Sequence, residues 1–242
     1  MSLRLSKRMA DLGLCSRREA DVLIAKGWVL VNGQVVDVLG SKVEPSDEIS
    51  LSPAASSYLK KKQSIILYKP VGYVSHASED HHPHVFDLLK LDACKSPNPM
   101  AIPTQGLAPV GRLDIDSKGL LILSQDGSLA RKIIAADSPV AKAYVVKLNE
   151  DLNAQELGLL SSGKAWANGQ LKPVKVRRLR KSLYELELKE GKNRQIRKMM
   201  EYLNKQVLML KRIRIGNLDL KGLEEGQWRR IEEKEKQILM SL

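Results

Sequence analysis

The stretch Gly111-Arg112-Leu113-Asp114-Ile115-Asp116-Ser117-Lys118-Gly119-Leu120-Leu121 decides how this 242-residue chain is interpreted. Two carboxylates, Asp114 and Asp116, come directly before the apolar run 120–124, which is typical of a buried strand. A carboxylate next to guanidinium groups is held in its ionised form, so Asp114, with Arg112 nearby, is a candidate nucleophile or base. An ion pair within a loop would have the same spacing, so spacing alone leaves both interpretations open.

Outward from this stretch, the chain divides into two parts. Residues 1–51 predict two short helices, the second capped by Ser16 and Glu19, and then a hairpin at Asn32-Gly33. Residues 52–62 are rich in Ser, Ala and Lys without periodicity, so we interpret them as a linker. In residues 63–242 short strands outnumber helices, which favours an α+β domain over a doubly wound one.

The charge of the chain predicts a polyanionic partner. Lys and Arg number 40 against 28 Asp and Glu, a formal net charge of +12. Residues 172–214 hold fifteen of the basic residues and only four acidic ones, and residues 1–28 form a smaller basic region. A charge run is often only a solvated face, but two separate basic regions favour nucleic-acid binding. Aromatic residues are 4% of the chain, which argues against a binding surface built from many stacked rings.

Several classes of protein lose support. The chain has no Walker loop, G-x-G-x-x-G turn, G-x-S-x-G elbow or H-E-x-x-H helix. Cys15 and Cys94 have no disulfide or metal-site spacing, and the four histidines crowd around Pro83 in what we interpret as a polar loop. No apolar stretch reaches the length of a membrane span or a signal peptide. We therefore expect a cytoplasmic protein without a membrane partner.

The motifs, taken in order, resemble a known family. The first fifty residues resemble the alpha-L RNA-binding module of a small-subunit ribosomal protein. The stretch around Asp114, the pair Lys142-x-Tyr144 and the run 190–199, Glu-Gly-Lys-Asn-Arg-Gln-Ile-Arg-Lys-Met, resemble the RsuA-like family of ribosomal RNA pseudouridine synthases. Lys69-Pro70-x-Gly72 and residues 226–229 fit the same family, so the resemblance spans nearly the whole chain.

This resemblance implies a fold, a reaction and its main residues. The fold would be α+β, with a small alpha-L domain at 1–51, a linker at 52–62 and, at 63–242, a catalytic domain with a largely antiparallel mixed sheet flanked by helices. Asp114 would be the nucleophile on a uridine flipped from its helix, attacking either the ribose or the uracil ring. Tyr144 would pack against the base, Arg197 would pair with Asp114, and Leu210 would form an apolar wall. No cofactor or metal is implied.

The resemblance also implies contacts to ribosomal RNA, either as a hairpin or within a pre-ribosomal particle. Further candidates are Arg112, Lys192, Asn193, Arg194 and Gln195 for the substrate, and Lys7, Arg17, Arg18 and Lys26 for RNA on the N-terminal module. The run Asn193-Arg194-Gln195 favours large-subunit RNA as the target. The loop 90–109 is longer than is typical of the family, and we expect a monomer.

Two other functions fit parts of the same sequence. A non-catalytic RNA-binding assembly factor would use Asp114 and Arg197 only as a structural ion pair. A DNA-binding regulator would use the N-terminal helix pair. The assembly factor predicts that replacing Asp114 leaves every pseudouridine in the RNA intact, and the regulator predicts tighter binding to duplex DNA than to a ribosomal hairpin at matched salt.

Overall fold

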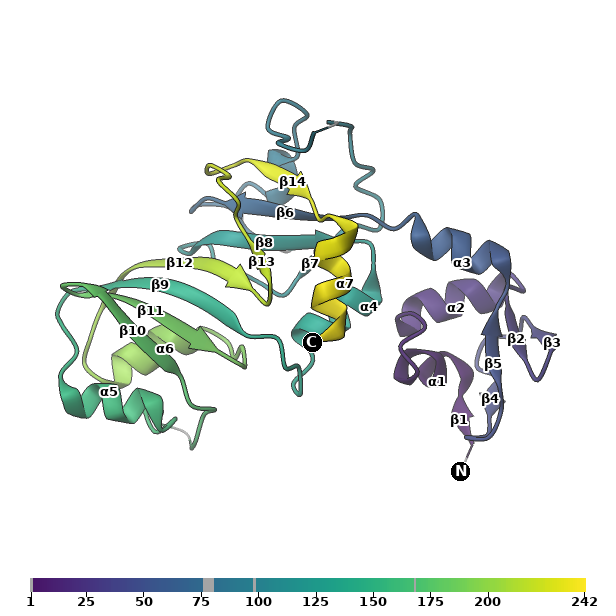
Figure 1. Ribbon diagram of the computed structural model, residues 1–242, viewed down its shortest axis with the longest axis horizontal. Coiled ribbons are helices and arrows are strands. Elements are labelled where there is room, and N and C mark those ends of the chain that lie inside the picture. The colour runs from purple at the N-terminus through teal and green to yellow at the C-terminus, as the bar shows by residue number, and fades with distance from the viewer. Residues whose placement is uncertain (1, 76–80, 98, 168) are drawn as a thin grey trace.

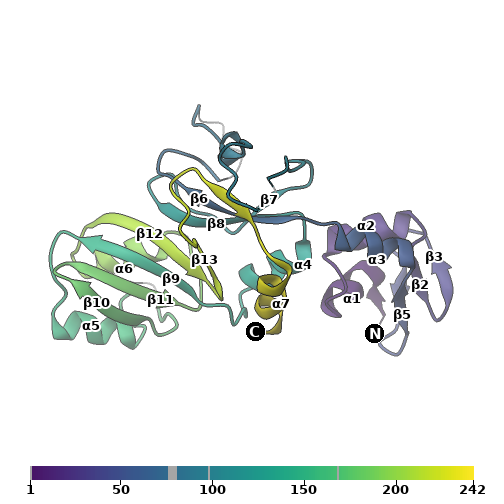
Figure 2. The same cartoon turned by 45° about the horizontal axis from the view of Figure 1, so that its top comes forward.

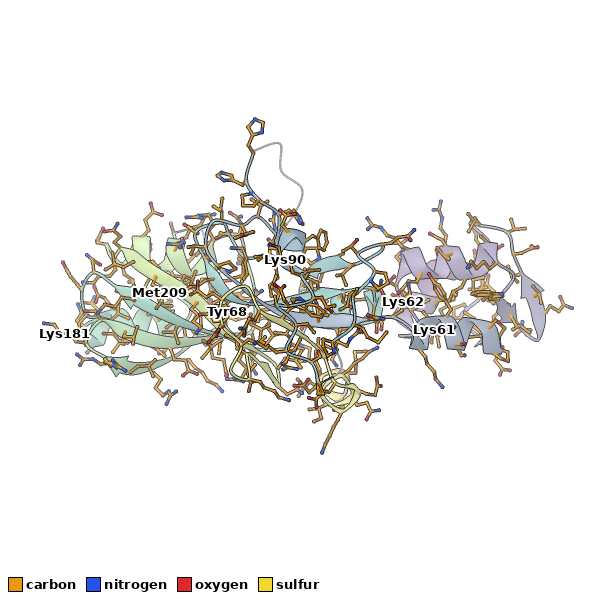
Figure 3. All side chains as sticks on the ribbon, turned by 90° about the horizontal axis from the view of Figure 1, so that it is seen from above. Lys61, Lys62, Tyr68, Lys90, Lys181 and Met209 are labelled. Carbon is orange, nitrogen blue, oxygen red and sulfur yellow. The ribbon has the colours of Figure 1, made fainter. Side chains whose placement is uncertain are left out.

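The computed structural model describes residues 2–75, 81–97, 99–167 and 169–242. Figure 1 shows a small N-terminal module at one end of an elongated molecule and a larger domain, built on one long sheet, over the rest. Seen from above in Figure 3, Lys61 and Lys62 lie at the neck between the two parts, and Lys181 lies at the opposite end of the large domain.

The N-terminal module follows the sequence prediction closely. Its helices are α1 (Leu5–Asp11) and α2 (Arg17–Ala25), and its strands are β1 (Leu3–Arg4), β2 (Val29–Val31), β3 (Gln34–Val36), β4 (Lys42–Val43) and β5 (Ile49–Leu51). Ser16 and Glu19 form the predicted capping box, with each side chain accepting the other residue's backbone N–H. Asn32 and Gly33 both have positive φ, as a tight hairpin turn requires, and join β2 to β3.

The segment expected to be an irregular linker is helical through most of its length. Helix α3 spans Pro53–Lys60, its N-terminus is capped by the Ser52 side chain, and Pro53 occupies the first turn. Ala55 is fully buried in the core of the N-terminal module, and the Tyr58 ring lies 5.9 Å from that of Trp28. The prediction of an irregular segment is therefore wrong for these residues, because a good start signal and an apolar face outweigh the Ser-rich composition.

The large domain contains the predicted mixed, largely antiparallel sheet. Its order is β10-β11-β9-β12-β8-β6-β14, with β13 paired to β12 and β7 paired to β8, and only β12 and β8 are parallel. The bounds are β6 (Ser64–Lys69), β7 (Ala108–Val110), β8 (Lys118–Ser124), β9 (Lys142–Leu148), β10 (Lys175–Arg180), β11 (Leu183–Leu188), β12 (Val207–Ile215), β13 (Leu218–Asp219) and β14 (Trp228–Arg230).

Helices cover the two halves of this sheet separately. In one half, α5 (Ala154–Ser161) and α6 (Gln195–Tyr202) pack on β9, β11 and β12. In the other half, α4 (Gly127–Ile134) and α7 (Glu233–Ser241) lie side by side against β6 and β8, as Figure 2 shows, and the short 3-10 helix η1 spans Val85–Leu88. The halves meet where β8 and β12 run parallel. This seam lies between the core under α5 and α6 and the two cores on the opposite faces of β6 and β8.

Gly119 allows the two strands to approach at the seam. It has φ +110°, and a Cβ at this position would lie 2.2 Å from the carbonyl oxygen of Arg212 on β12. No other residue fits so close to that backbone. Gly119 is therefore required for the close pairing of β8 with β12. The turn that carries Asp114 lies immediately before it.

Candidate active site

Asp114 lies in a tight turn between β7 and β8, and the side chain of Lys69 donates hydrogen bonds to backbone carbonyls of this turn. The turn is closed by the N–H of Ser117, which donates to the Asp114 carbonyl at 3.0 Å. Lys69 is fully buried at the end of β6, and its Nζ donates to the carbonyl oxygens of Pro70, Asp114 and Ser117 at 2.9, 3.1 and 2.8 Å. Burial lowers the pKa of Lys69 to about 8. These bonds fix the backbone from which the Asp114 carboxylate projects.

Two arginines from α6 and its N-terminus bind the carboxylates of this turn. Arg194 bridges them, with Nη1 at 3.4 Å from Asp114 Oδ2 and Nη2 at 3.3 Å from Asp116 Oδ2. It stands in the left-handed region, at φ 49°, as the residue that precedes α6. Arg197 lies 3.1 Å from Asp116 Oδ1 and donates to the Asp116 carbonyl at 3.0 Å.

The predicted pairing of Arg197 with Asp114 is therefore wrong in this structure. Arg197 is one turn into α6 and reaches Asp116, whereas Arg194 at the helix start reaches Asp114. Burial opposes ionisation of Asp116, but Arg197 and Arg194 together outweigh it and hold its pKa below the usual value. Asp116, which the sequence analysis singled out only as a neighbouring carboxylate, is thus the residue shared by both guanidinium groups.

A cavity of about 480 Å³ opens above Asp114 along the seam. Its size suits a small ligand such as one nucleotide. Eight of the predicted site residues line it, all of them except Arg197 and the four on the N-terminal module: Arg112, Asp114, Tyr144, Lys192, Asn193, Arg194, Gln195 and Leu210. The structure thus brings together residues from three motifs that lie up to about a hundred positions apart.

The sheet explains how Tyr144 and Leu210 come to share this cavity. Tyr144 on β9 is paired with Arg212 on β12, and Leu210 is paired with Val146 two residues further along β9. Directly paired residues in an antiparallel ladder point to the same face, so these side chains form one wall. Leu210 is nearly buried and Tyr144 is half-buried.

Two basic cavity residues were missed by the sequence analysis as site residues. Arg212 is buried, its Nε donates to the Leu120 carbonyl at 2.7 Å, and its Nη2 has no hydrogen-bond partner in the described part of the chain. Lys142 donates to the Ile133 carbonyl, and burial lowers its pKa to about 8, with the Arg212 charge adding to this effect. Lys142 belongs to the motif Lys142-x-Tyr144, which was a usable signal. For Arg212, the pairing of β12 with β9 was needed.

Gln195 has a different place from the one expected for a substrate contact. It is buried, its Oε1 accepts the N–H of Lys192 at 2.9 Å, and its Nε2 donates to Glu190 Oε1 at 2.8 Å. It therefore holds the turn that presents Lys192 and Asn193, which are both exposed at the cavity.

The four basic residues predicted on the N-terminal module, Lys7, Arg17, Arg18 and Lys26, are all exposed and lie away from the cavity. Arg17 and Arg18 form the first turn of α2, where backbone N–H groups also favour an anion. Lys26 lies over the rings of Trp28 and Tyr58, with its Nζ 4.5 and 5.1 Å from their centroids.

The described residues show neither a metal cluster nor a membrane-spanning helix. They contain no group of three or more His, Cys, Asp or Glu side chains placed to hold a metal ion. Among the same residues, no helix has the length and apolar character of a membrane span. His76 lies outside the described residues, so the predicted polar histidine loop is described only in part.

Comparisons with known proteins identify the family and agree with the fold. Residues 63–202 match the RNA pseudouridylate synthase family, and residues 3–49 match the S4 domain. The ribosomal large subunit pseudouridine synthase B of Bacillus subtilis is 35% identical over 99% of this chain and 96% of its own length. The dual-specificity RNA pseudouridine synthase RluF of Escherichia coli K12 is 31% identical over 94% of this chain and 75% of its own length.

A solved structure described as a pseudouridylate synthase superposes with a TM-score of 0.67 and 27% identity, covering 98% of this chain and all of that one. The chain belongs to the RNA pseudouridine synthases of the RsuA type, which are isomerases acting on RNA, and it carries an S4 domain at its N-terminus. The predicted family, fold class and enzyme class are thereby confirmed.

Proposed function

We propose that this enzyme converts one uridine of ribosomal RNA to pseudouridine, with Asp114 as the nucleophile. The observation that carries the proposal is the position of Asp114 at a basic, nucleotide-sized cavity, on a turn fixed by two bonds from Lys69. A preorganised carboxylate facing a cavity of this size suits attack on a base that has left its helix.

The reaction exchanges one bond to the anomeric carbon for another. Asp114 attacks either the anomeric carbon or the uracil ring, the bond from N1 to the anomeric carbon breaks, and the uracil turns. C5 then forms the new bond to the anomeric carbon, and the bond to Asp114 breaks and releases the carboxylate. The proton on C5 is then lost to a base, and N1 gains one, so atoms and charge balance. Tyr144 packs against the uracil and is the proposed acceptor of that proton.

The other cavity residues hold the nucleotide during these steps. Leu210 gives the apolar wall against which the uracil turns, and Arg212 and Lys142 supply positive charge. Arg194 orients the Asp114 carboxylate from the cavity rim, and Arg197 acts through Asp116. Arg112, Lys192 and Asn193 are the proposed contacts to the phosphates around the target.

The proposed target lies in large-subunit RNA, and the proposed compartment is the cytoplasm. The run Asn193-Arg194-Gln195 and the printed name of the Bacillus subtilis relative support the large subunit. Lys7, Arg17, Arg18 and Lys26 on the N-terminal module are proposed to bind phosphates of the same RNA, and the enzyme is proposed to act as a monomer without a cofactor.

The test compares pseudouridine maps of total RNA from wild-type, deletion and Asp114→Asn strains. We expect the deletion and the Asp114→Asn strain to lose the same pseudouridine, because Asn is isosteric but is no nucleophile. The purified variant should still bind the target hairpin with an affinity within about threefold of wild type. If the Asp114→Asn strain keeps every pseudouridine that the deletion strain loses, the protein acts as an assembly factor and Asp114 is not the nucleophile.

A further inference from the structure

Trp166 lies in a loop that the active-site motifs do not include. The loop follows α5 and closes at its base, where the N–H of Leu171 donates to the Gly163 carbonyl at 2.9 Å. Trp166 is half-buried and packs against the same core cluster as Tyr144. The indole is therefore held in place by the large domain and still reaches solvent.

This loop is joined to the turn that lines the cavity. Glu190, a cavity residue, accepts with Oε1 both the N–H of Lys172 at 3.0 Å and the side-chain amide of Gln195 at 2.8 Å. The same Gln195 holds Lys192 at the cavity. The loop and the rim of the active site thus form one hydrogen-bonded unit, which places Trp166 next to the rim.

Two lysines meet over the Trp166 ring. The Nζ atoms of Lys192 and Lys198 each lie 5.8 Å from the ring centroid. Both side chains are exposed, and across the described ranges of the chain neither forms an ion pair with a carboxylate. A cation over an exposed ring is only weakly held, so these charges are available to a stronger anion such as a phosphate.

We propose that Trp166, Lys192 and Lys198 form a subsite for a nucleotide adjoining the target uridine. The base of this nucleotide stacks on the indole, and its phosphates bind the two ammonium groups. Such stacking accepts any base, because every base has a π face, and the phosphate contacts are equally indifferent to sequence. The inference rests on the proposed function, since it takes RNA as the substrate. The subsite would bind the RNA strand next to the flipped nucleotide.

A binding experiment tests the stacking without turnover. The probe is a short oligouridylate that carries one 2-aminopurine beside its central uridine. Stacking on indole should quench the 2-aminopurine fluorescence when wild-type protein binds. We expect Trp166→Ala to lose most of that quenching and Trp166→Phe, which keeps a ring, to retain about half of it or more. Thermal unfolding checks that both variants are folded, and the Phe variant preserves the packing against the core.

Kinetics on the mapped target hairpin give the second measurement. A contact made equally in the ground state and the transition state changes KM and leaves kcat nearly constant. We expect Trp166→Ala to raise KM about tenfold with kcat within about twofold, and Trp166→Phe to raise KM less than about threefold.

The lysine arm has a matched control. Lys198→Gln should reduce the slope of log affinity against log salt by about one, as loss of one phosphate contact predicts. Lys234→Gln, on exposed α7 and outside the subsite, should leave the slope unchanged. If Trp166→Ala quenches like wild type and Lys198→Gln has the slope of Lys234→Gln, the subsite is disproved. That result is separate from a failure of the Asp114→Asn test, because the quenching requires no catalysis.

Discussion

Arg194 and Arg197 lie three residues apart at the start of α6, but they differ in exposure and in the carboxylates that they contact. Arg194 precedes the helix in a left-handed conformation and keeps an exposed guanidinium between the two carboxylates. Arg197 is mostly buried, and besides Asp116 it contacts the carbonyl of Val207 at 3.4 Å. The first arginine therefore binds the Asp114 carboxylate, and the second also connects the turn to α6 and β12.

This difference predicts distinct variants. Arg194→Gln should lower kcat/KM at least about tenfold without a change in the free energy of unfolding, because its side chain is exposed and its partners stay solvated. Arg197→Gln should lower activity and also cost about 1–3 kcal/mol of stability, since it leaves partly buried acceptors without a charged donor. The measurements are pseudouridine formation on the target hairpin and urea unfolding of the same samples. Full activity in Arg194→Gln, with an inactive but stable Arg197→Gln, would assign the Asp114 contact to Arg197.

At the scale of elements, the sequence predicted the buried strand that follows Asp114. The apolar run 120–124 is part of β8, a strand buried along almost its full length. Helix α3 was missed because its composition was weighed above Ser52 and Pro53, which are a sound helix start. The strand order could not be read from the sequence, because long-range pairing leaves no local signal.

Prediction of the candidate site had the same limit. Residues within one motif could be predicted, and residues that enter the site through long-range strand pairing could not. Residues inside contiguous motifs, such as Asp114 and Lys192, were found together at the cavity. Arg212 was not, since it enters the site only through the pairing of β12 with β9. The pairing of Arg197 with Asp116 could not be predicted from the sequence either. Which carboxylate Arg197 contacts depends on the direction of α6, which is set by the left-handed conformation of Arg194.

Glu235 of helix α7 forms a buried ion pair with Arg229 of β14, which predicts a pH dependence. Glu235 accepts two hydrogen bonds from Arg229 on β14, at 2.8 and 3.0 Å, and lies 2.8 Å from Lys221. Burial opposes ionisation of Glu235, but its bonds to Arg229 and Lys221 outweigh this and lower its pKa from 4.5 to about 2. A carboxyl with a lowered folded pKa stabilises the fold fully above its unfolded pKa. That contribution is lost as the pH falls from about 4.5 to about 2.

Glu235→Gln should therefore unfold about 2–3 kcal/mol more easily at pH 7, and the gap to wild type should close below about pH 3. The measurement is the free energy of unfolding in urea across this pH range. Glu233→Gln, exposed on the same helix, is the control and should follow wild type at every pH. A gap between Glu235→Gln and wild type that stays constant down to pH 2.5 would mean that packing, rather than the ion pair, holds α7.

At the scale of the whole molecule, the N-terminal module is held against α4 of the large domain. The N–H of Gly127 donates to Glu19 Oε1 at 3.3 Å, and Arg131 lies 3.1 Å from Asp11. Helix α3 and Lys62 form the covalent neck visible in Figure 3, and Lys62 lies 3.9 Å from Glu19. Glu19 thus caps its own helix, contacts the neck and accepts from the other domain, so one carboxylate coordinates three parts of the chain.

Gly127 leaves no room for a side chain at this contact, and this predicts how to separate the two domains. A Cβ there would lie 2.3 Å from Ser16 Cβ and 2.9 Å from Glu19 Oε2. Its φ is not in the left-handed region, so Gly127→Ala tests space alone. We expect Gly127→Ala to displace the N-terminal module and so to increase the radius of gyration in X-ray scattering. Two linked RNA-binding sites bind best when their spacing is fixed, so hairpin binding should weaken about three- to tenfold.

The matched control is Gly158→Ala in α5, where a Cβ meets nothing within 4 Å. This change should stabilise the protein by up to about 1 kcal/mol and leave scattering and RNA affinity unaltered. Catalysis separates a displaced module from a damaged active site, because kcat at saturating RNA should be the same in both variants while KM rises only in Gly127→Ala. Equal scattering and equal KM in the two variants would show that the module does not rest on α4 in solution. The distance between the S4 domain and the cavity would then be set by the neck alone.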